Sequence, residues 1–161
     1  MCSSDLEAAQ LSLSVLDELG LEAFVKTSGG KGLHLVVPLA RKDDWDTVKA
    51  FTNSIAQFMA QQLPERFTAT SGPKNRVGKI FIDYLRNARG ASTVTAYSVR
   101  APPGLPVSVP ISREEMMSLR SAQQWTVANL HERLQALKGD PWAGYANRQK
   151  IIKKMWDKLG A

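Results

Sequence analysis

Asp83 is the residue of this sequence whose setting most needs a chemical explanation. It lies in the apolar segment from Lys79 to Leu85 (KIFIDYL), whose composition predicts a buried β-strand. Because burial of a carboxylate without a partner is costly, we expect Asp83 to bind a metal ion or to pair with a cation. Lys79 and Arg86 are the cations close to it in the sequence. A metal ligand and a structural ion pair are therefore both open for this residue.

A glycine-rich turn from Ser28 to Gly32 (SGGKG) joins two predicted strands at residues 22–27 and 33–39. Successive glycines let backbone N–H groups approach a phosphate closely, and Ser28 and Lys31 add a hydroxyl and a charge. The turn is not a Walker A loop, because its spacing differs and because it joins two strands rather than a strand and a helix. It is either a phosphate-binding turn or a plain hairpin turn.

Three further side chains are candidates for contacts with phosphate. His34 interrupts an apolar strand just after the glycine-rich turn, where it either contacts a phosphate or packs as a hydrogen-bonded histidine. Arg86 follows Asp83 by three residues, and Arg100 ends the β-like run that starts at Ala96. Arginine binds phosphate through two parallel hydrogen bonds, but either arginine is equally consistent with a surface position.

The basic charge of the chain is unevenly distributed. Residues 1–64 carry five basic and eight acidic side chains, residues 65–100 carry seven basic and two acidic, and residues 145–161 carry five basic and one acidic. Basic clusters attract phosphate and release counterions on binding it, which indicates nucleic acid or nucleotides as partners. A solvated basic surface is the alternative.

The elements that must position these residues follow from apolar spacing, caps and turns. Helices are predicted from about residue 7 to Gly20, from Asp43 or Asp44 to Pro64, after a capping box of Ser112 and Glu115, and at residues 126–137 and 147–159. Strands are predicted at residues 22–27, 33–39, 67–70 and 79–85, and residues 101–110, with four prolines, are expected to be a connector. The order predicts an α+β domain with a small antiparallel sheet.

The composition is that of an ordinary folded protein, with 43% hydrophobic and 22% charged residues. No apolar run approaches the roughly 20 residues needed to cross a bilayer, so no membrane association is expected. The single cysteine, Cys2, has no intramolecular partner for a disulfide. A reducing cytoplasm is the expected location.

Four segments together resemble the polymerase domain of bacterial ATP-dependent DNA ligase D, a member of the archaeo-eukaryotic primase superfamily. They occur in the family's order and spacing: Phe24 to His34 (FVKTSGGKGLH), Lys79 to Asn87 (KIFIDYLRN), Thr95 to Ala101 (TAYSVRA) and Gly139 to Trp142 (GDPW). The resemblance covers about residues 7–144, with residues 145–161 as a basic C-terminal helix. It implies an RRM-like primase catalytic core of which this chain is the C-terminal portion.

The resemblance implies template-dependent nucleotidyl transfer that fills gaps and extends broken DNA ends in non-homologous end joining. Two divalent ions, Mn²⁺ or Mg²⁺, would activate the primer hydroxyl and stabilise the leaving pyrophosphate. By the family pattern Asp83 is a catalytic, metal-binding carboxylate. Five further residues match family positions around the incoming nucleoside triphosphate: Ser28, Lys31, His34, Arg86 and Arg100. The implied partners are DNA ends, gapped duplex, the Ku end-binding protein and ligase and nuclease domains of one parent. The implied location is the bacterial cytoplasm, at the nucleoid.

The chain departs from the family at its N-terminal side. The family's other metal carboxylates form an Asp-x-Asp pair before the first helix, and Asp5 has no acidic neighbour two residues away. Residues 1–6 (MCSSDL) read like the translated end of a sequencing adapter, so we expect them to be a non-native leader. We therefore predict a chain that is catalytically silent by itself. A non-catalytic DNA-binding module and a nucleotide-binding regulatory domain are the alternatives.

Overall fold

The computed structural model describes residue 1 and residues 3–161. Cys2 lies outside the described residues, and so does any expectation that rests on it. The described chain forms two compact units, each made of several chain segments. Unit 1 comprises Met1–Leu13, Glu22–Pro38 and Val94–Arg148. Unit 2 comprises Ser14–Leu21, Leu39–Thr93 and Gln149–Ala161.

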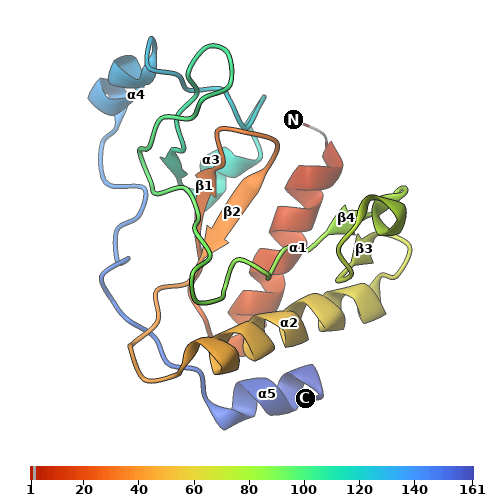
Figure 1. Cartoon of the computed structure of the whole chain (residues 1–161). Helices are drawn as coiled ribbons and strands as arrows, with labels where there is room; N and C mark the ends of the chain where they lie inside the picture. Colours follow the sequence, from red (N-terminus) through yellow and green to blue (C-terminus); the bar gives the residue numbers. More distant parts are fainter. Residues whose placement is uncertain (2) are drawn as a thin grey trace. The chain divides into compact units, whose positions relative to one another are not determined.

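Unit 1 contains a three-stranded antiparallel sheet in the order β2-β1-β5. Strands β1 (Phe24–Thr27) and β2 (Leu33–Val36) form the predicted hairpin, which is drawn in orange in Figure 1. β5 (Pro110–Ile111) pairs with the other edge of β1. All four residues of the central strand β1 are buried. The prediction of a mixed fold with a small antiparallel sheet is therefore confirmed.

The segment expected to be a connector also supplies much of the core of unit 1. Val107 and Val109 of this segment are 1% and 0% exposed, and Ile111, directly after it, is 1% exposed. The prediction holds for residues 101–109, which contain no helix or strand, and is wrong only for Pro110, which lies in the edge strand β5, where a missing N–H is tolerated. The apolar residues between the prolines pack against β1.

Two short helices complete unit 1. α3 (Arg113–Met116) begins with the predicted capping box of Ser112 and Glu115. α4 (Leu130–Ala136) begins later than predicted, because Thr126 forms an isolated β-bridge with Pro106 and residues 127–129 form a turn. Its Arg133 pairs with Glu115 at 2.5 Å and lies over the Trp125 ring. Burial raises the pKa of Glu115, but hydrogen bonds from Arg133 and Ser112 outweigh burial and leave that pKa lowered.

The first helix, α1 (Ser3–Leu19), contributes residues to both units. It begins four residues before the predicted start and ends as predicted at Gly20, whose φ is +83°. Leu6 is buried, at 8% exposed. The helical period therefore extends into the residues that were expected to be a leader.

Unit 2 is built on α2 (Trp45–Gln62), which begins at the predicted cap, Asp44. The Asp44 carboxylate accepts a hydrogen bond from the Thr47 N–H at 2.8 Å. α5 (Lys153–Leu159) packs against α2 through the rings of Trp156 and Phe51, 5.2 Å apart, and Figure 1 shows the two helices side by side. The predicted helix at residues 147–159 is therefore confirmed only in its second half.

A second, parallel sheet in unit 2 joins β3 (Phe67–Thr68) to β4 (Ile80–Phe81), with the 3-10 helix η1 (Pro73–Arg76) between them. The predicted buried strand at residues 79–85 is wrong in its length. β3 has only two residues, so the ladder ends at Phe81 and Asp83 lies outside it. None of the described helices has both the length and the apolarity needed to cross a bilayer.

Candidate phosphate-binding site

The glycine-rich turn is organised around the hydroxyl of Ser28. Ser28 follows β1 directly and is 7% exposed, and its N–H donates to the Gly32 carbonyl at 3.0 Å. The N–H groups of Gly30 and Gly32 both donate to Ser28 Oγ, at 3.0 and 3.1 Å. Two backbone donors thus converge on one oxygen atom. Both donors are therefore satisfied within the turn, and they hold the Ser28 hydroxyl in a fixed position.

Gly29 fits the turn tightly against the chain that follows β4. Its φ is +66°, and a Cβ atom placed there would lie 2.8 Å from Cγ of Arg100. Its N–H donates to the Ala122 carbonyl at 3.0 Å. Arg100 Nη1 donates in turn to the Ser28 carbonyl at 2.7 Å. The Arg100 guanidinium therefore stabilises the turn through the Ser28 carbonyl and places a positive charge next to it.

Lys31 and His34 differ in their exposure to solvent. Lys31 is exposed at the tip of the turn, whereas His34 is half-buried on β2. His34 stands opposite Lys26 in the strand register, and Lys26 Nζ lies 3.1 Å from His34 Nδ1. The structure thus brings four predicted phosphate contacts into unit 1: Ser28, Lys31, His34 and Arg100.

Lys26 is a neighbour of the site that the sequence reasoning missed. It is 4% exposed, and its ammonium also donates to the Val94 carbonyl at 2.6 Å and to Ser108 Oγ at 2.9 Å. Burial, and to a lesser degree the charge of Arg100, lowers the pKa of Lys26 to about 8. The signal that would have found Lys26 is the one used for Asp83, a charged residue inside an apolar strand.

Asp83 and Arg86 lie in unit 2 and are both exposed. The prediction that Asp83 is buried is therefore wrong, and the carboxylate does not need a partner to offset desolvation. Asp83 Oδ1 accepts the N–H of Leu85 at 3.0 Å. Within residues 1 and 3–161, no ion pair joins Asp83 to Lys79 or Arg86.

The described residues do not fit a two-metal site. Across residues 1 and 3–161, no three side chains of the types His, Cys, Asp and Glu lie together so that they could hold a metal ion. Asp83 brings one carboxylate, whereas two bridged divalent cations need several anionic oxygen ligands.

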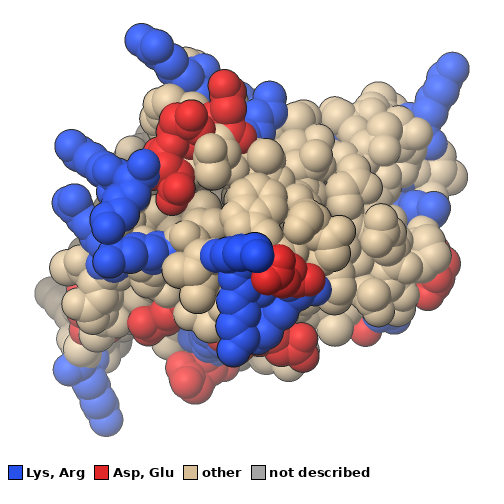
Figure 2. Space-filling model, turned by 90° about the horizontal axis from the view of Figure 1, so that it is seen from below, with Lys and Arg blue, Asp and Glu red and all other residues tan. Residues whose placement is uncertain are grey.

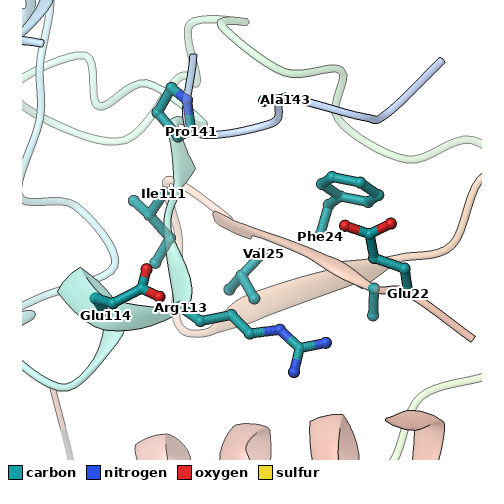
Figure 3. A pocket seen from close by; sticks show the side chains of 9 residues that line it. Glu22, Phe24, Val25, Ile111, Arg113, Glu114, Pro141 and Ala143 are labelled. Carbon is teal, nitrogen blue, oxygen red and sulfur yellow. The ribbon is translucent and has the colours of Figure 1, made fainter. Parts of the chain in front are cut away.

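A small cavity in unit 1 lies apart from the glycine-rich turn. Its volume is about 170 Å³, and it is lined by residues of β1, β5 and α3 with Pro141 and Ala143. Figure 3 shows the carboxylate of Glu22 beside the ring of Phe24, with Arg113 below them. Ligand pockets usually enclose roughly 300–1,000 Å³. The cavity is too small for a nucleotide and includes none of the predicted phosphate contacts.

The charged side chains do not form one continuous basic patch on the face seen in Figure 2. Lys and Arg side chains stand there in several groups, with Asp and Glu side chains among them. Net charge alone therefore does not define a binding surface on that face, and the candidate site depends on the geometry of the turn.

Comparisons with known proteins agree with the resemblance drawn from the motifs. Residues 3–142 match the family model described as the primase-polymerase domain of LigD. The chain is 64% identical over 157 residues to the multifunctional non-homologous end joining protein LigD of Pseudomonas aeruginosa, covering 96% of the chain and 19% of that protein. It is 30% identical over 130 residues to the bifunctional non-homologous end joining protein LigD of Bacillus subtilis, covering 80% and 21%.

The fold matches a solved structure as well. The polymerase domain of Mycobacterium tuberculosis ligase D in complex with DNA has a TM-score of 0.80 and 27% sequence identity, covering 91% of this chain and 51% of that one. The chain thus spans about a fifth of the curated LigD proteins, at 19% and 21% of their lengths. By its motifs, its sequence and its fold, this chain belongs to the LigD primase-polymerase domain family.

Proposed function

We propose that this chain is the triphosphate-binding portion of a polymerase that transfers nucleotides to DNA ends in non-homologous end joining. The observation that carries this proposal is the turn in which two backbone N–H groups converge on Ser28 Oγ. The two N–H groups fix the position of the Ser28 oxygen, whose hydroxyl proton a phosphate oxygen would accept, and the family's activity is nucleotidyl transfer. The Arg100 charge behind the turn and the exposed Lys31 at its tip favour an anionic ligand there.

Each residue of the turn has a distinct part in this proposal. The Ser28 hydroxyl donates its own proton to a phosphate oxygen while its oxygen keeps the two glycine N–H groups in place. Lys31 adds charge at the exposed end, where its flexible side chain adapts to the ligand. His34 donates a ring N–H to a second phosphate oxygen. Arg86 as a further triphosphate contact and Asp83 as a catalytic metal ligand stay predictions.

Divalent ions enter this proposal only through the family. Mn²⁺ or Mg²⁺, when bound with nucleotide, would activate the attacking hydroxyl and stabilise the leaving pyrophosphate. The described residues offer that site only Asp83, so we propose that the chain alone binds nucleoside triphosphate and does not extend a primer. The proposed partners are DNA ends and gapped duplex, Ku and the ligase and nuclease domains of a parent protein, in the bacterial cytoplasm at the nucleoid.

Nucleotide binding is the direct test of the turn. The 161-residue chain would be titrated with a nucleoside triphosphate in the presence of Mg²⁺ by calorimetry. Removing two charge-assisted contacts with Ser28→Ala and His34→Ala is expected to lower affinity by at least about tenfold. Ser92→Ala with His131→Ala makes the same two changes at exposed residues, serves as the matched control and is expected to leave binding within about twofold. Equal affinity of a folded Ser28→Ala, His34→Ala variant and the wild type would contradict the proposal.

Primer extension separates this proposal from a non-catalytic DNA-binding module. The chain would be incubated with Mn²⁺, nucleoside triphosphates and a primed, gapped duplex. We expect nucleotide binding without extension. Primer extension by the isolated chain would refute the proposal that it is inactive alone. DNA binding without any nucleotide binding would favour the non-catalytic DNA-binding module.

A further inference from the structure

A closed hydrogen-bond network surrounds the buried amine of Lys26. Its Nζ has three partners, namely Val94 O at 2.6 Å, Ser108 Oγ at 2.9 Å and His34 Nδ1 at 3.1 Å. Three acceptors match the three protons of an ammonium group. The direction of each hydrogen bond therefore follows from the protons that the partners have available.

Two of these directions are fixed by chemistry alone. The Val94 carbonyl has no proton to donate, so it accepts from Lys26. The Ser108 hydroxyl donates its single O–H hydrogen bond to the Thr27 carbonyl at 2.7 Å. Its oxygen must therefore accept the hydrogen bond from Lys26. The third proton of the ammonium then points to His34 Nδ1. A histidine nitrogen that accepts carries no proton itself.

We propose that Lys26 is a positioning residue for the candidate phosphate site, because its ammonium fixes the neutral His34 ring with its proton on Nε2. A second proton on His34 would place a cation 3.1 Å from the buried ammonium of Lys26. The lysine thus keeps the ring neutral and selects one of its two tautomers.

The consequence for ligand binding rests on the proposed function. Phosphate oxygens at neutral pH act mainly as hydrogen-bond acceptors, so only a nitrogen that carries a proton can serve them. With the proton on Nε2, the edge of the ring turned away from Lys26 is the donor edge. Lys26 itself does not touch the ligand in this scheme, and it acts only through His34.

Deprotonation of Lys26 reverses the arrangement. A neutral amine has two N–H groups, which donate hydrogen bonds to Val94 O and Ser108 Oγ. Its lone pair then accepts a hydrogen bond from a protonated His34 Nδ1. The tautomer therefore changes as the Lys26 pKa of about 8 is passed. Among the described side chains, the titratable or charged groups that face this amine are His34 from β2 and Arg100 from the chain after Val94.

The experiment measures the two ring nitrogens of His34 by ¹⁵N NMR in the full chain without nucleotide. The sequence has two histidines, and the exposed His131 is removed by His131→Asn for assignment. At pH 7 we expect Nδ1 to resonate as a nitrogen without a proton and Nε2 as an N–H. Through about pH 8 the two signals should move in opposite directions. Signals that stay constant from pH 7 to pH 9 would overturn the proposal.

A variant pair tests the role of the lysine. Lys26→Met keeps the length of the side chain and removes the amine, and it should abolish the transition near pH 8. Lys42→Met makes the same change at an exposed lysine in unit 2 and should leave that transition intact. Persistence of the transition in folded Lys26→Met would refute the proposal. If Lys26→Met does not fold, the wild-type titration decides by itself.

Nucleotide affinity is measured in a separate experiment, so that the proposed triphosphate site and the proposed role of Lys26 can be refuted independently. If the site binds triphosphate, affinity should fall by about tenfold in Lys26→Met, the loss expected for one charge-assisted hydrogen bond. A confirmed tautomer change with affinity unaffected by His34→Ala would refute the nucleotide site and leave the role of Lys26 standing. Loss of affinity in His34→Ala without any tautomer change would refute the role of Lys26 alone.

Discussion

Gly29→Ala tests whether the turn is held in one conformation by its neighbours. Gly29 has a φ of +66°, in the left-handed region, and an added Cβ would lie 2.8 Å from Cγ of Arg100 and 3.4 Å from the Val107 carbonyl carbon. The arginine side chain can move, but Nη1 would then lose its 2.7 Å hydrogen bond to the Ser28 carbonyl. The backbone of Val107 cannot move without disturbing the core.

Two contributions determine how much Gly29→Ala lowers the free energy of unfolding. A non-glycine residue in the left-handed region costs about 1–2 kcal/mol. Loss of a hydrogen bond from a charged donor costs about 1.5–3 kcal/mol. We therefore expect Gly29→Ala to lower the free energy of unfolding by about 3 kcal/mol, with a fall in Tm of about 6–12 °C for a chain of this size.

Gly32→Ala in the same turn is the matched control. Nothing lies within 4 Å of a Cβ at Gly32, and its φ lies outside the left-handed region. Gly32 makes its hydrogen bonds to Ser28 Oγ and from the Ser28 N–H through its own backbone atoms, so an added methyl group leaves both intact. Urea unfolding followed by tryptophan fluorescence should place this variant within about 0.5 kcal/mol of the wild type. If both variants are equally stable, the tight fit of Gly29 against Arg100 is refuted.

Three further predictions concern stability. The pKa of Lys26 is lowered from 10.5 to about 8, so the unfolded chain binds more protons between these values, and the stability of the wild type relative to Lys26→Met should rise with pH in urea unfolding from about pH 8 to 10.5. The lowered pKa of Glu115 means that its carboxylate stabilises the fold above pH 4.5 and that this contribution is lost on acidification. Glu115→Gln should therefore weaken the acid dependence of Tm, and an unchanged acid dependence would exclude the pair with Arg133 as its source. Trp142→Phe removes the 2.8 Å hydrogen bond from Nε1 to the Val25 carbonyl and should cost about 1–2 kcal/mol in thermal unfolding, whereas no loss would show that solvent replaces the carbonyl.

Local sequence signals predicted the hairpin and the helix caps well. The glycines between two apolar runs indicated the turn from Ser28 to Gly32, and the register of β1 and β2 confirms it. Asp44 and the capping box of Ser112 act within one helical turn, so their spacing in the sequence carries the whole signal. These predictions needed no information about distant parts of the chain.

Predictions failed where a distant partner decides the structure. The apolar run around Asp83 indicated a strand, but a strand is only as long as its partner, and β3 offers two residues. Pro110 reads as a loop residue until its place at an edge of the sheet is known. The acceptors of the Lys26 ammonium, Val94 and Ser108, lie 68 and 82 residues away, so the sequence around Lys26 does not show which groups bind it. Local motifs thus located the candidate site. They did not show the distant residues that hold its side chains in place.

The distant support of the turn has a kinetic consequence. Lys26, Thr27 and Ser28 each have at least one hydrogen bond with a partner 68 to 82 residues further along the chain. Such contacts form only after a long loop has closed, and proteins rich in them fold slowly. During synthesis the hairpin therefore emerges long before the residues that hold its turn in shape. The geometry of the turn is therefore acquired late in folding, when the second half of the chain has joined the first.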